Sequence, residues 1–337
     1  MNHAAIAGLL ARYGQLAGSY AVLGEDPWQF STRHDSAGEL VGFTPYLRTS
    51  RAAVVWRGPV GESGSELAAL AALDEDLGPK ISRFILGADQ AVTDAAMRLG
   101  YEKIWIGTDC ITSLEGWSLA GGRRRKIRWA RNHAASSHEW CEVFPATDLE
   151  ARQQMLEVEA EWKNARKARA TDSFLRTALM DQVDIRRYFA CRESATGKIN
   201  SYVSCLPVNA NEWYLQDCVR LSHAERGTLE GAVALACETF SSEGFTSVSN
   251  GILPMYEFDA QNSGGHDEQR PETSWLRRSI IRFADSRYRF SGLNQFRMKL
   301  VPDETRPVYA LLKPGRPSVR GLAGFGRITT KRLDPAP

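Results

Sequence analysis

Long uncharged apolar runs are missing from this sequence, and their absence limits what kind of protein it encodes. The longest fall well short of the roughly 18 to 20 residues that a helix needs to cross a bilayer, so we predict no transmembrane helix. Residues 1–20 have the pattern of an amphipathic helix with Arg12 in its middle, without the cationic head, apolar centre and cleavage site of a signal peptide. We expect a cytoplasmic protein, with peripheral membrane binding left open.

Cysteine and histidine spacings typical of metal sites or disulfide frameworks are also absent. The six cysteines include no C-x-x-C pair and lie mostly inside apolar runs, which is typical of reduced, buried thiols. The six histidines are scattered along the chain. We therefore expect no metal site and no resident cofactor.

An excess of either charge is lacking too, since 42 Lys and Arg face 40 Asp and Glu. Glycine and proline are near average usage, and nine Trp with thirteen Phe suffice for a core, so a disordered or fibrous chain is excluded. A length of 337 residues corresponds to one large domain or two ordinary ones.

The expected elements are mixed α/β, and their order occurs twice. In the first half we predict a helix, three strands, then helix, strand, helix and strand, at 3–18, 28–33, 39–47, 51–57, 65–77, 81–87, 89–99 and 102–107. In the second half we predict a strand, a long helix, a hairpin and third strand, then a helix and strand, at 140–144, 149–169, 187–193, 200–208, 212–221, 227–242 and 245–249. This repetition favours a duplicated fold with mixed sheets flanked by helices.

The polar stretch 132–138 is the expected joint between the halves. We therefore divide the chain into domains at 1–138 and 139–315, followed by a tail at 316–337. That tail is rich in Gly, Pro and Arg with hardly an acid, which suggests a flexible basic arm that adds affinity for RNA or membranes.

Basic side chains concentrate in a helix-like segment that contains no acid. Six cations occupy nine positions and would cover most of a helix circumference, so they cannot all pair with carboxylates on one neighbouring face. The predicted polyanion-binding residues are Arg123, Arg124, Arg125, Lys126, Arg128 and Arg131. A second cluster at 277–299 mixes cations with aromatic residues, a combination suited to a nucleic-acid backbone and stacked bases.

Residues 220–228 are predicted to contain the end of a strand, a polar loop and the start of a helix. The residues of this turn indicate whether the chain can bind acyl-CoA. In an N-acetyltransferase-like fold such a turn binds the diphosphate of acyl-CoA through an Arg/Gln-x-x-Gly-x-Gly/Ala pattern at a helix N-terminus. Here only Arg226-Gly227 and Gly231 remain, at a different spacing. The sequence favours this fold more than an acyl-CoA site.

Four ordered blocks resemble the catalytic domain of phosphatidylglycerol lysyltransferases. They are L-Q-D-C-V-R at 215–220, G-T-L-E at 227–230, N-G-I-L-P-M at 250–255 and Y-R-F-S-G-L-N-Q-F-R-M-K-L-V-P at 288–302. The corresponding family blocks read D-L-M-R, G-T-M-D, L-G-M-A-P-L and F-Y-N-F-x-G-L-x-x-Y-K-x-K-F-x-P. The resemblance covers nearly the whole chain and implies tandem N-acetyltransferase (GNAT)-like domains that take an aminoacyl group from aminoacyl-tRNA, the co-substrate.

The resemblance also implies site residues. It gives Asp217 and Arg220 as catalytic: Asp217 would orient or deprotonate the acceptor or hold the aminoacyl ammonium, and Arg220 would face a phosphate or the oxyanion. The alternative is that these two merely pair across a strand end. Substrate-binding positions are Glu230, Gly251, Arg297 and Lys299, with helix capping and a strand bend as the alternatives for Glu230 and Gly251.

The acceptor is the least determined part of this hypothesis. Val308 replaces a family Arg, Cys218-Val219 replace Leu-Met, and the large membrane-embedded half of many lipid-modifying members is absent. We therefore expect a small-molecule acceptor, for instance in antibiotic assembly, with a phosphatidylglycerol head group as a close second. An acyl-CoA-dependent N-acyltransferase and a non-catalytic tRNA-binding protein remain alternatives, and the oligomeric state stays open.

Overall fold

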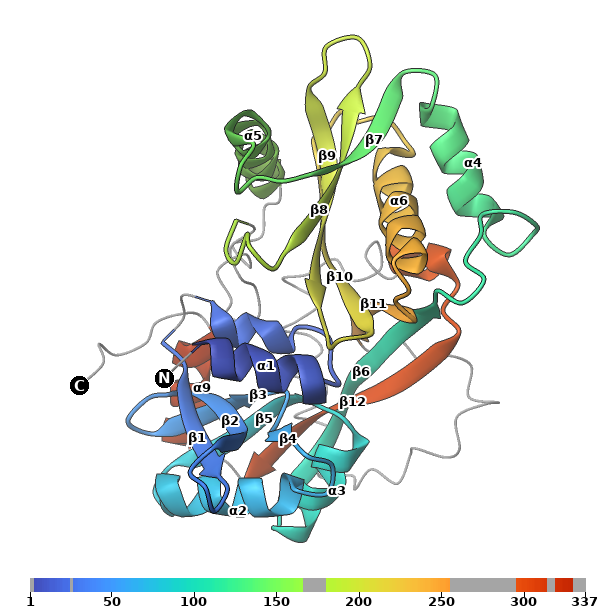
Figure 1. Cartoon of the computed structure of the whole chain (residues 1–337). Helices are drawn as coiled ribbons and strands as arrows, with labels where there is room; N and C mark the ends of the chain where they lie inside the picture. Colours follow the sequence, from blue (N-terminus) through green and yellow to red (C-terminus); the bar gives the residue numbers. More distant parts are fainter. Residues whose placement is uncertain (1–2, 25–26, 166–179, 255–294, 314–318, 330–337) are drawn as a thin grey trace.

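The computed structural model describes residues 3–24, 27–165, 180–254, 295–313 and 319–329. One mixed sheet runs through this part of the chain and joins a lower and an upper half (Figure 1). Its strand order is β1-β2-β3-β5-β12-β6-β11-β10-β9-β8-β7, and β4 pairs with β2 beside this path.

Ten of the twelve strands in the described residues correspond to predicted ones, although β6 and β11 extend beyond their predicted ends, and β4 and β12 have no predicted counterpart. The twelve strands are β1 (Gln29–His34), β2 (Leu40–Arg48), β3 (Ala52–Trp56), β4 (Val60–Gly61), β5 (Ser82–Ala88), β6 (Glu102–Ser113), β7 (His138–Val143), β8 (Arg187–Glu193), β9 (Ile199–Pro207), β10 (Glu212–Arg220), β11 (Ser247–Pro254) and β12 (Glu304–Lys313). The helices are α1 (His3–Tyr13), α2 (Glu66–Leu77), α3 (Gln90–Arg98), α4 (Arg125–Ala134), α5 (Leu149–Ala165), α6 (Thr228–Ser242) and α9 (Val319–Thr329), with short 3-10 turns η1 (Ser19–Leu23) and η3 (Met298–Leu300).

The same arrangement of elements occurs in both halves. Strands β1, β2 and β3 form an antiparallel meander, α2 then follows, and β5 lies parallel to β3. Strands β8, β9 and β10 repeat that meander, α6 follows, and β11 lies parallel to β10. This repetition confirms the predicted mixed α/β class with duplicated element order.

Strand β12 ties the halves together. It is antiparallel to both β5 and β6, and β6 is antiparallel to β11, so the sheet continues from one half into the other. Residues 304–313 thus lie within the sheet of the first half, although the predicted boundary assigns them to a domain at 139–315. The division at residue 138 into separate units stays a prediction.

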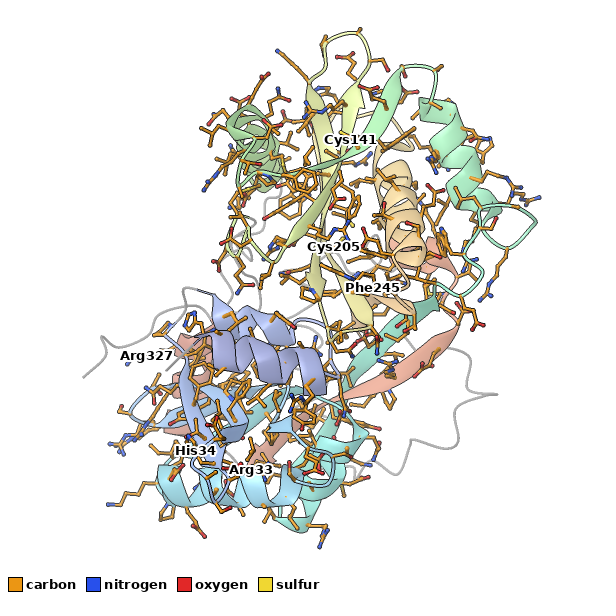
Figure 2. The ribbon with its side chains drawn as sticks, viewed as in Figure 1. Arg33, His34, Cys141, Cys205, Phe245 and Arg327 are labelled. Carbon is orange, nitrogen blue, oxygen red and sulfur yellow. The ribbon has the colours of Figure 1, made fainter. Side chains whose placement is uncertain are left out.

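Helices cover both faces of the sheet in each half. In the lower half, α2 and α3 bury one apolar face of β3 and β5, while α1 and α9 bury the other. In the upper half, α5 packs on the face that carries Tyr188, Tyr202 and Val219. Helix α6 packs on the opposite face, over a core that includes Cys205 and Phe245 (Figure 2).

Three expectations need correction. The first helix ends at Tyr13, not at residue 18, and the strand predicted at 102–107 continues to Ser113. A wholly flexible tail is wrong for residues 319–329, because α9 buries Ile328 and sets Phe325 against Phe84 at 4.7 Å between ring centroids.

The cysteines can be compared with the expectation of reduced, buried thiols. All six cysteines are free, and burial raises the pKa of the Cys110 and Cys191 thiols to about 12, which keeps both protonated near neutral pH.

The predicted helix at 149–169 is described only as far as Ala165. Among the described residues, no helix is long and apolar enough to span a membrane.

Helices α4 and α6 touch through a glycine. Gly227, the N-cap of α6, has φ of 108°, and a Cβ there would lie 1.9 Å from the carbonyl oxygen of Ala130. Gly244 also has positive φ, at 89°, but a Cβ there would meet nothing within 4 Å. Both glycines thus have positive φ, but only Gly227 also lies against a neighbouring helix.

This difference gives a stability prediction. Gly244→Ala should cost about 1–2 kcal/mol from the left-handed backbone alone. Gly227→Ala should cost about 1–3 kcal/mol more, since α4 must move away. Urea denaturation measures both variants, and equal losses would show that the α4–α6 contact does not depend on this glycine.

Candidate active site

The predicted catalytic residues lie where two parallel strands part. Strand β10 pairs with β11 only from Glu212 to Tyr214, opposite Ser247 to Ser249. Beyond Tyr214 it continues to Arg220 along β9, while β11 continues along β6 past a register shift between Ser249 and Ile252. The motif residues Asp217, Arg220 and Gly251 all lie beyond this branch point.

Asp217 lies on the face covered by α5 and contacts a buried arginine. Its carboxylate oxygen Oδ2 is 3.7 Å from Nη1 of Arg186, whose side chain has no exposed surface. The same oxygen accepts a hydrogen bond of 3.4 Å from the hydroxyl of Ser204, which also accepts one from Arg186 at 3.2 Å. These two neighbours fix the direction of the carboxylate.

Arg220 is not the partner of Asp217. A register shift between Leu215 and Asp217 leaves Gln216 as the extra residue, and the ladder is regular from there to Arg220. Side chains three positions apart on a regular strand point to opposite faces. Arg220 therefore lies exposed on the α6 side, and the alternative in which it pairs with Asp217 is wrong.

A row of polar side chains continues across the central strands on the Asp217 face. Glu212 accepts a hydrogen bond from Ser247 at 2.9 Å and lies 3.3 Å from Arg306, while burial raises its pKa. Asp109 is fully buried and accepts a 2.6 Å hydrogen bond from Ser249. Its second oxygen has no hydrogen-bond partner among the described residues.

Tyr214 stands at the branch point, between two glycines. A Cβ on Gly251, where φ is 79°, would lie 2.8 Å from the Tyr214 ring and 2.9 Å from Nη2 of Arg297. A Cβ on Gly18 would lie 3.9 Å from the same ring and 3.6 Å from Nη2 of Arg57. Burial raises the pKa of Tyr214, and the charges of Arg297 and Arg57 oppose that rise. Gly251 thus makes room for protein side chains.

Arg57 reaches this place from the first half of the chain. It follows β3 with φ of 68°, is 5% exposed, and its guanidinium lies 4.7 Å from the centre of the Trp56 ring. Burial lowers the pKa of Arg57. Gly87 leaves the space for it, because a Cβ there would be 2.9 Å from Arg57.

Sequence reasoning missed Arg57, Asp109, Arg186 and Tyr214. For Arg57 and Asp109 the available signal was a charged residue inside or directly after an apolar strand, as in I-W-I-G-T-D-C-I-T for Asp109. Charged side chains are rarely buried without a partner or a function, so such positions are candidates even without a motif.

Glu230 and Lys299, predicted separately, meet on the α6 side. Glu230 lies in the first turn of α6 and is 7% exposed, and its Oε1 is 2.6 Å from Nζ of Lys299. Arg297 lies two residues before Lys299 and donates to the carbonyl oxygen of Ile252. The structure therefore brings the four predicted substrate-binding residues together in two pairs.

The six predicted tRNA-binding cations differ in their contacts. Arg123 pairs with Asp303 and Arg131 with Glu238, each at 2.6 Å. Arg124 lies 3.9 Å from the centre of the Trp117 ring, and burial lowers its pKa.

Arg128 donates to the carbonyl oxygens of Leu119 and Gly121. Acids, backbone carbonyls and an aromatic ring on several elements thus contact four of these cations. Arg125 and Lys126 are exposed and have no ion pair within the described ranges. Binding of tRNA by these residues stays a prediction.

Part of the second basic cluster, residues 277–294, lies outside the described residues. Within the described part of the chain, no group of three or more His, Cys, Asp or Glu has the arrangement to hold a metal ion.

The chain belongs to a known family. Residues 28–312 match the family model described as phosphatidylglycerol lysyltransferase, C-terminal, which confirms the resemblance seen in the motifs. None of the curated protein sequences matches this chain.

Solved structures confirm the fold. The C-terminal domain of a protein provisionally described as a lysylphosphatidylglycerol synthetase from Agrobacterium fabrum is 15% identical with a TM-score of 0.77, and the match covers 97% of this chain and 96% of that one. The structure of L-PGS from Bacillus licheniformis is 16% identical with a TM-score of 0.72, over 98% and 96% of the two chains. FemX is 10% identical with a TM-score of 0.51, over 82% and 92%. The family identifies the chain as an acyltransferase of the aminoacyltransferase class.

The Glu230–Lys299 contact gives a second prediction. Removing the cation with Lys299→Met should destabilise the protein by about 3 kcal/mol, because a nearly buried carboxylate loses its partner. Glu230→Gln in that background should recover part of the loss. A double-mutant cycle in urea checks this, and a coupling energy near zero would contradict a stabilising pair.

Proposed function

We propose that the protein transfers an aminoacyl group from aminoacyl-tRNA to a hydroxyl of the phosphatidylglycerol head group. The observation that carries the proposal is the placement of Asp217, the acid of the family's D-x-x-R block, at the branch of β10 and β11 against Arg186 and Ser204. The match to the phosphatidylglycerol lysyltransferase family supports the substrate class. A small-molecule acceptor, our first expectation, gains no comparable support.

The reaction is an exchange of esters. The acceptor oxygen attacks the carbonyl carbon of the aminoacyl ester, a new C–O bond forms, and the bond to the tRNA ribose oxygen breaks. Asp217 takes the proton of the attacking hydroxyl, and the leaving ribose oxygen gains a proton. Because the ester is already activated, correct placement and proton transfer are the main tasks of the protein.

We assign Arg220 a different task. It lies on the opposite face of β10 from Asp217 and is exposed. A phosphate of one of the substrates is therefore a better ligand for it than the oxyanion that forms beside Asp217. Arg220 on that face can bind a phosphate without contacting the reacting carbonyl.

The test of the reaction uses purified protein, tRNA charged with a labelled amino acid, and phosphatidylglycerol vesicles. Label should move into the lipid and stop when ribonuclease is added first. Acyl transfer from acetyl-CoA that ignores ribonuclease would overturn the proposal in favour of an acyl-CoA enzyme. Salt-dependent tRNA binding without turnover on any acceptor would favour a non-catalytic binder.

Asp217→Asn should lower the rate of lipid labelling by about 10²–10⁴-fold, because the amide cannot accept the proton. Glu139→Gln, which removes an exposed carboxylate from β7, is the matched control and should leave the rate unchanged. Binding of tRNA should be the same in both variants. A rate for Asp217→Asn within twofold of the control would exclude Asp217 as the base.

A further inference from the structure

Tyr214 and Asp217 are neighbours on the same face of β10. Their opposite residues on β9 are Leu206 and Ser204, which are two positions apart and therefore point to one face of the sheet. The extra residue at the bulge, Gln216, moves Asp217 to the place that residue 216 would take on a regular strand. Two positions along a strand correspond to about 6.5–7 Å, so one bound molecule can contact both side chains.

A guanidinium group lies near each edge of the Tyr214 ring. The ring carbons Cε1 and Cε2 flank the carbon that carries the hydroxyl, one on each edge. A Cβ on Gly18 would lie 3.9 Å from Cε1 and 3.6 Å from Nη2 of Arg57. A Cβ on Gly251 would lie 2.8 Å from Cε2 and 2.9 Å from Nη2 of Arg297. The hydroxyl end of the ring is thus set between two cations that come from different halves of the chain.

The charges around Tyr214 keep its hydroxyl protonated and favour the anion that forms when the proton leaves. Burial raises the pKa of the phenol, and the negative charges of Asp217 and Asp109 add to that rise. The positive charges of Arg297 and Arg57 oppose it. The phenol therefore holds its proton at neutral pH, and the two cations stabilise the phenolate.

The hydroxyl of Tyr214 is available to a bound molecule. The side chain is partly exposed, and its hydroxyl forms no hydrogen bond to another of the described residues. Tyr101 differs in this respect, because its hydroxyl donates to Asp74 at 2.8 Å in the lower half.

The other polar groups described near Asp217 are less suited to give up a proton. Arg57, Arg186 and Arg297 carry guanidinium groups, which stay protonated in proteins. The hydroxyl of Ser204 already donates to Asp217 at 3.4 Å. A phenol is also a much stronger acid than the hydroxyl of a serine.

We propose that Tyr214 is the general acid of the transfer, whose hydroxyl donates a proton to the ribose oxygen that leaves the aminoacyl ester. This inference rests on the proposed function, in which that proton has no named source. The proton of the acceptor hydroxyl passes to Asp217 as the new C–O bond forms, and the proton of Tyr214 passes to the ribose oxygen as the old C–O bond breaks. Asp217 then returns its proton to the phenolate through water, so both residues regain their starting state.

The experiment compares the wild type with Tyr214→Phe in single turnovers, with enzyme in excess over tRNA charged with a labelled amino acid and with phosphatidylglycerol vesicles as the acceptor. Phenylalanine keeps the ring between the two glycines and removes the proton donor, so label transfer should slow by about 10²-fold or more. Tyr46→Phe, which removes a hydroxyl from the core under α2 and α3, is the matched control and should keep the wild-type rate. Binding of charged tRNA and thermal unfolding should agree among the three proteins.

A second donor separates acid catalysis from a structural role of Tyr214. In this tRNA a sulfur atom replaces the ribose oxygen that carries the amino acid, and a thiolate leaves without needing a proton. Tyr214→Phe should then react within about threefold of the wild type, while Asp217→Asn should stay slow with both donors because the acceptor must still lose its proton.

Two results would overturn the inference. One is a rate of Tyr214→Phe on the ester within about twofold of the control, which would assign the transfer of the proton to Asp217 itself. The other is an equal loss on the ester and the thioester, which would make Tyr214 a structural residue. In both cases the wild type still transfers label, so the proposed function stands. A wild type that transfers no label from the ester contradicts the proposed function as well.

Discussion

The hydrogen bonds of β12 to both β5 and β6 are the constraint on which the rest of the structure depends. Without this strand, β5 and β6 would each present an unpaired edge, and the two halves would be joined only by the chain between them. With it, one ladder continues from the meander β1–β3 to the meander β8–β10. The repeated element order therefore produces one sheet whose halves have a fixed relative position.

This fixed position matters at the site, because both halves contribute side chains to it. Arg57 follows β3 of the first half and lies near Gly18 and Tyr214, while Arg297 lies near Gly251 and Tyr214, and the charges of both arginines act on the Tyr214 hydroxyl. Asp217 lies on the same face of β10 with its own buried arginine, Arg186. The cations of α4, predicted to bind tRNA, lie on the opposite face. The sheet thus separates the proposed proton acceptor from the predicted phosphate contacts.

Local patterns in the sequence identify nearly every strand, because the alternation of apolar and polar residues and the turn residues between strands depend only on near neighbours. For β8 the predicted range, 187–193, is the observed one. The place of β12 could not be predicted, because its partners lie about 200 residues away. The motifs located Asp217. They did not show that Arg186 lies beside it, because the side chains that Asp217 meets depend on how β10 pairs with β9, including the register shift at Gln216. Likewise, Asp303 and Glu238 pair with the basic helix from distant positions.

The central claim is that β12 makes the two halves one cooperative unit, and native-state hydrogen exchange tests it most directly. The amides of β5, in the first half, and of β9, in the second, should exchange with the same free energy of opening and the same dependence on denaturant. Protection in β5 that is lower by about 2 kcal/mol or more, with a shallower denaturant dependence, would show that the first half opens alone. That result would contradict the account and favour independent domains at 1–138 and 139–315.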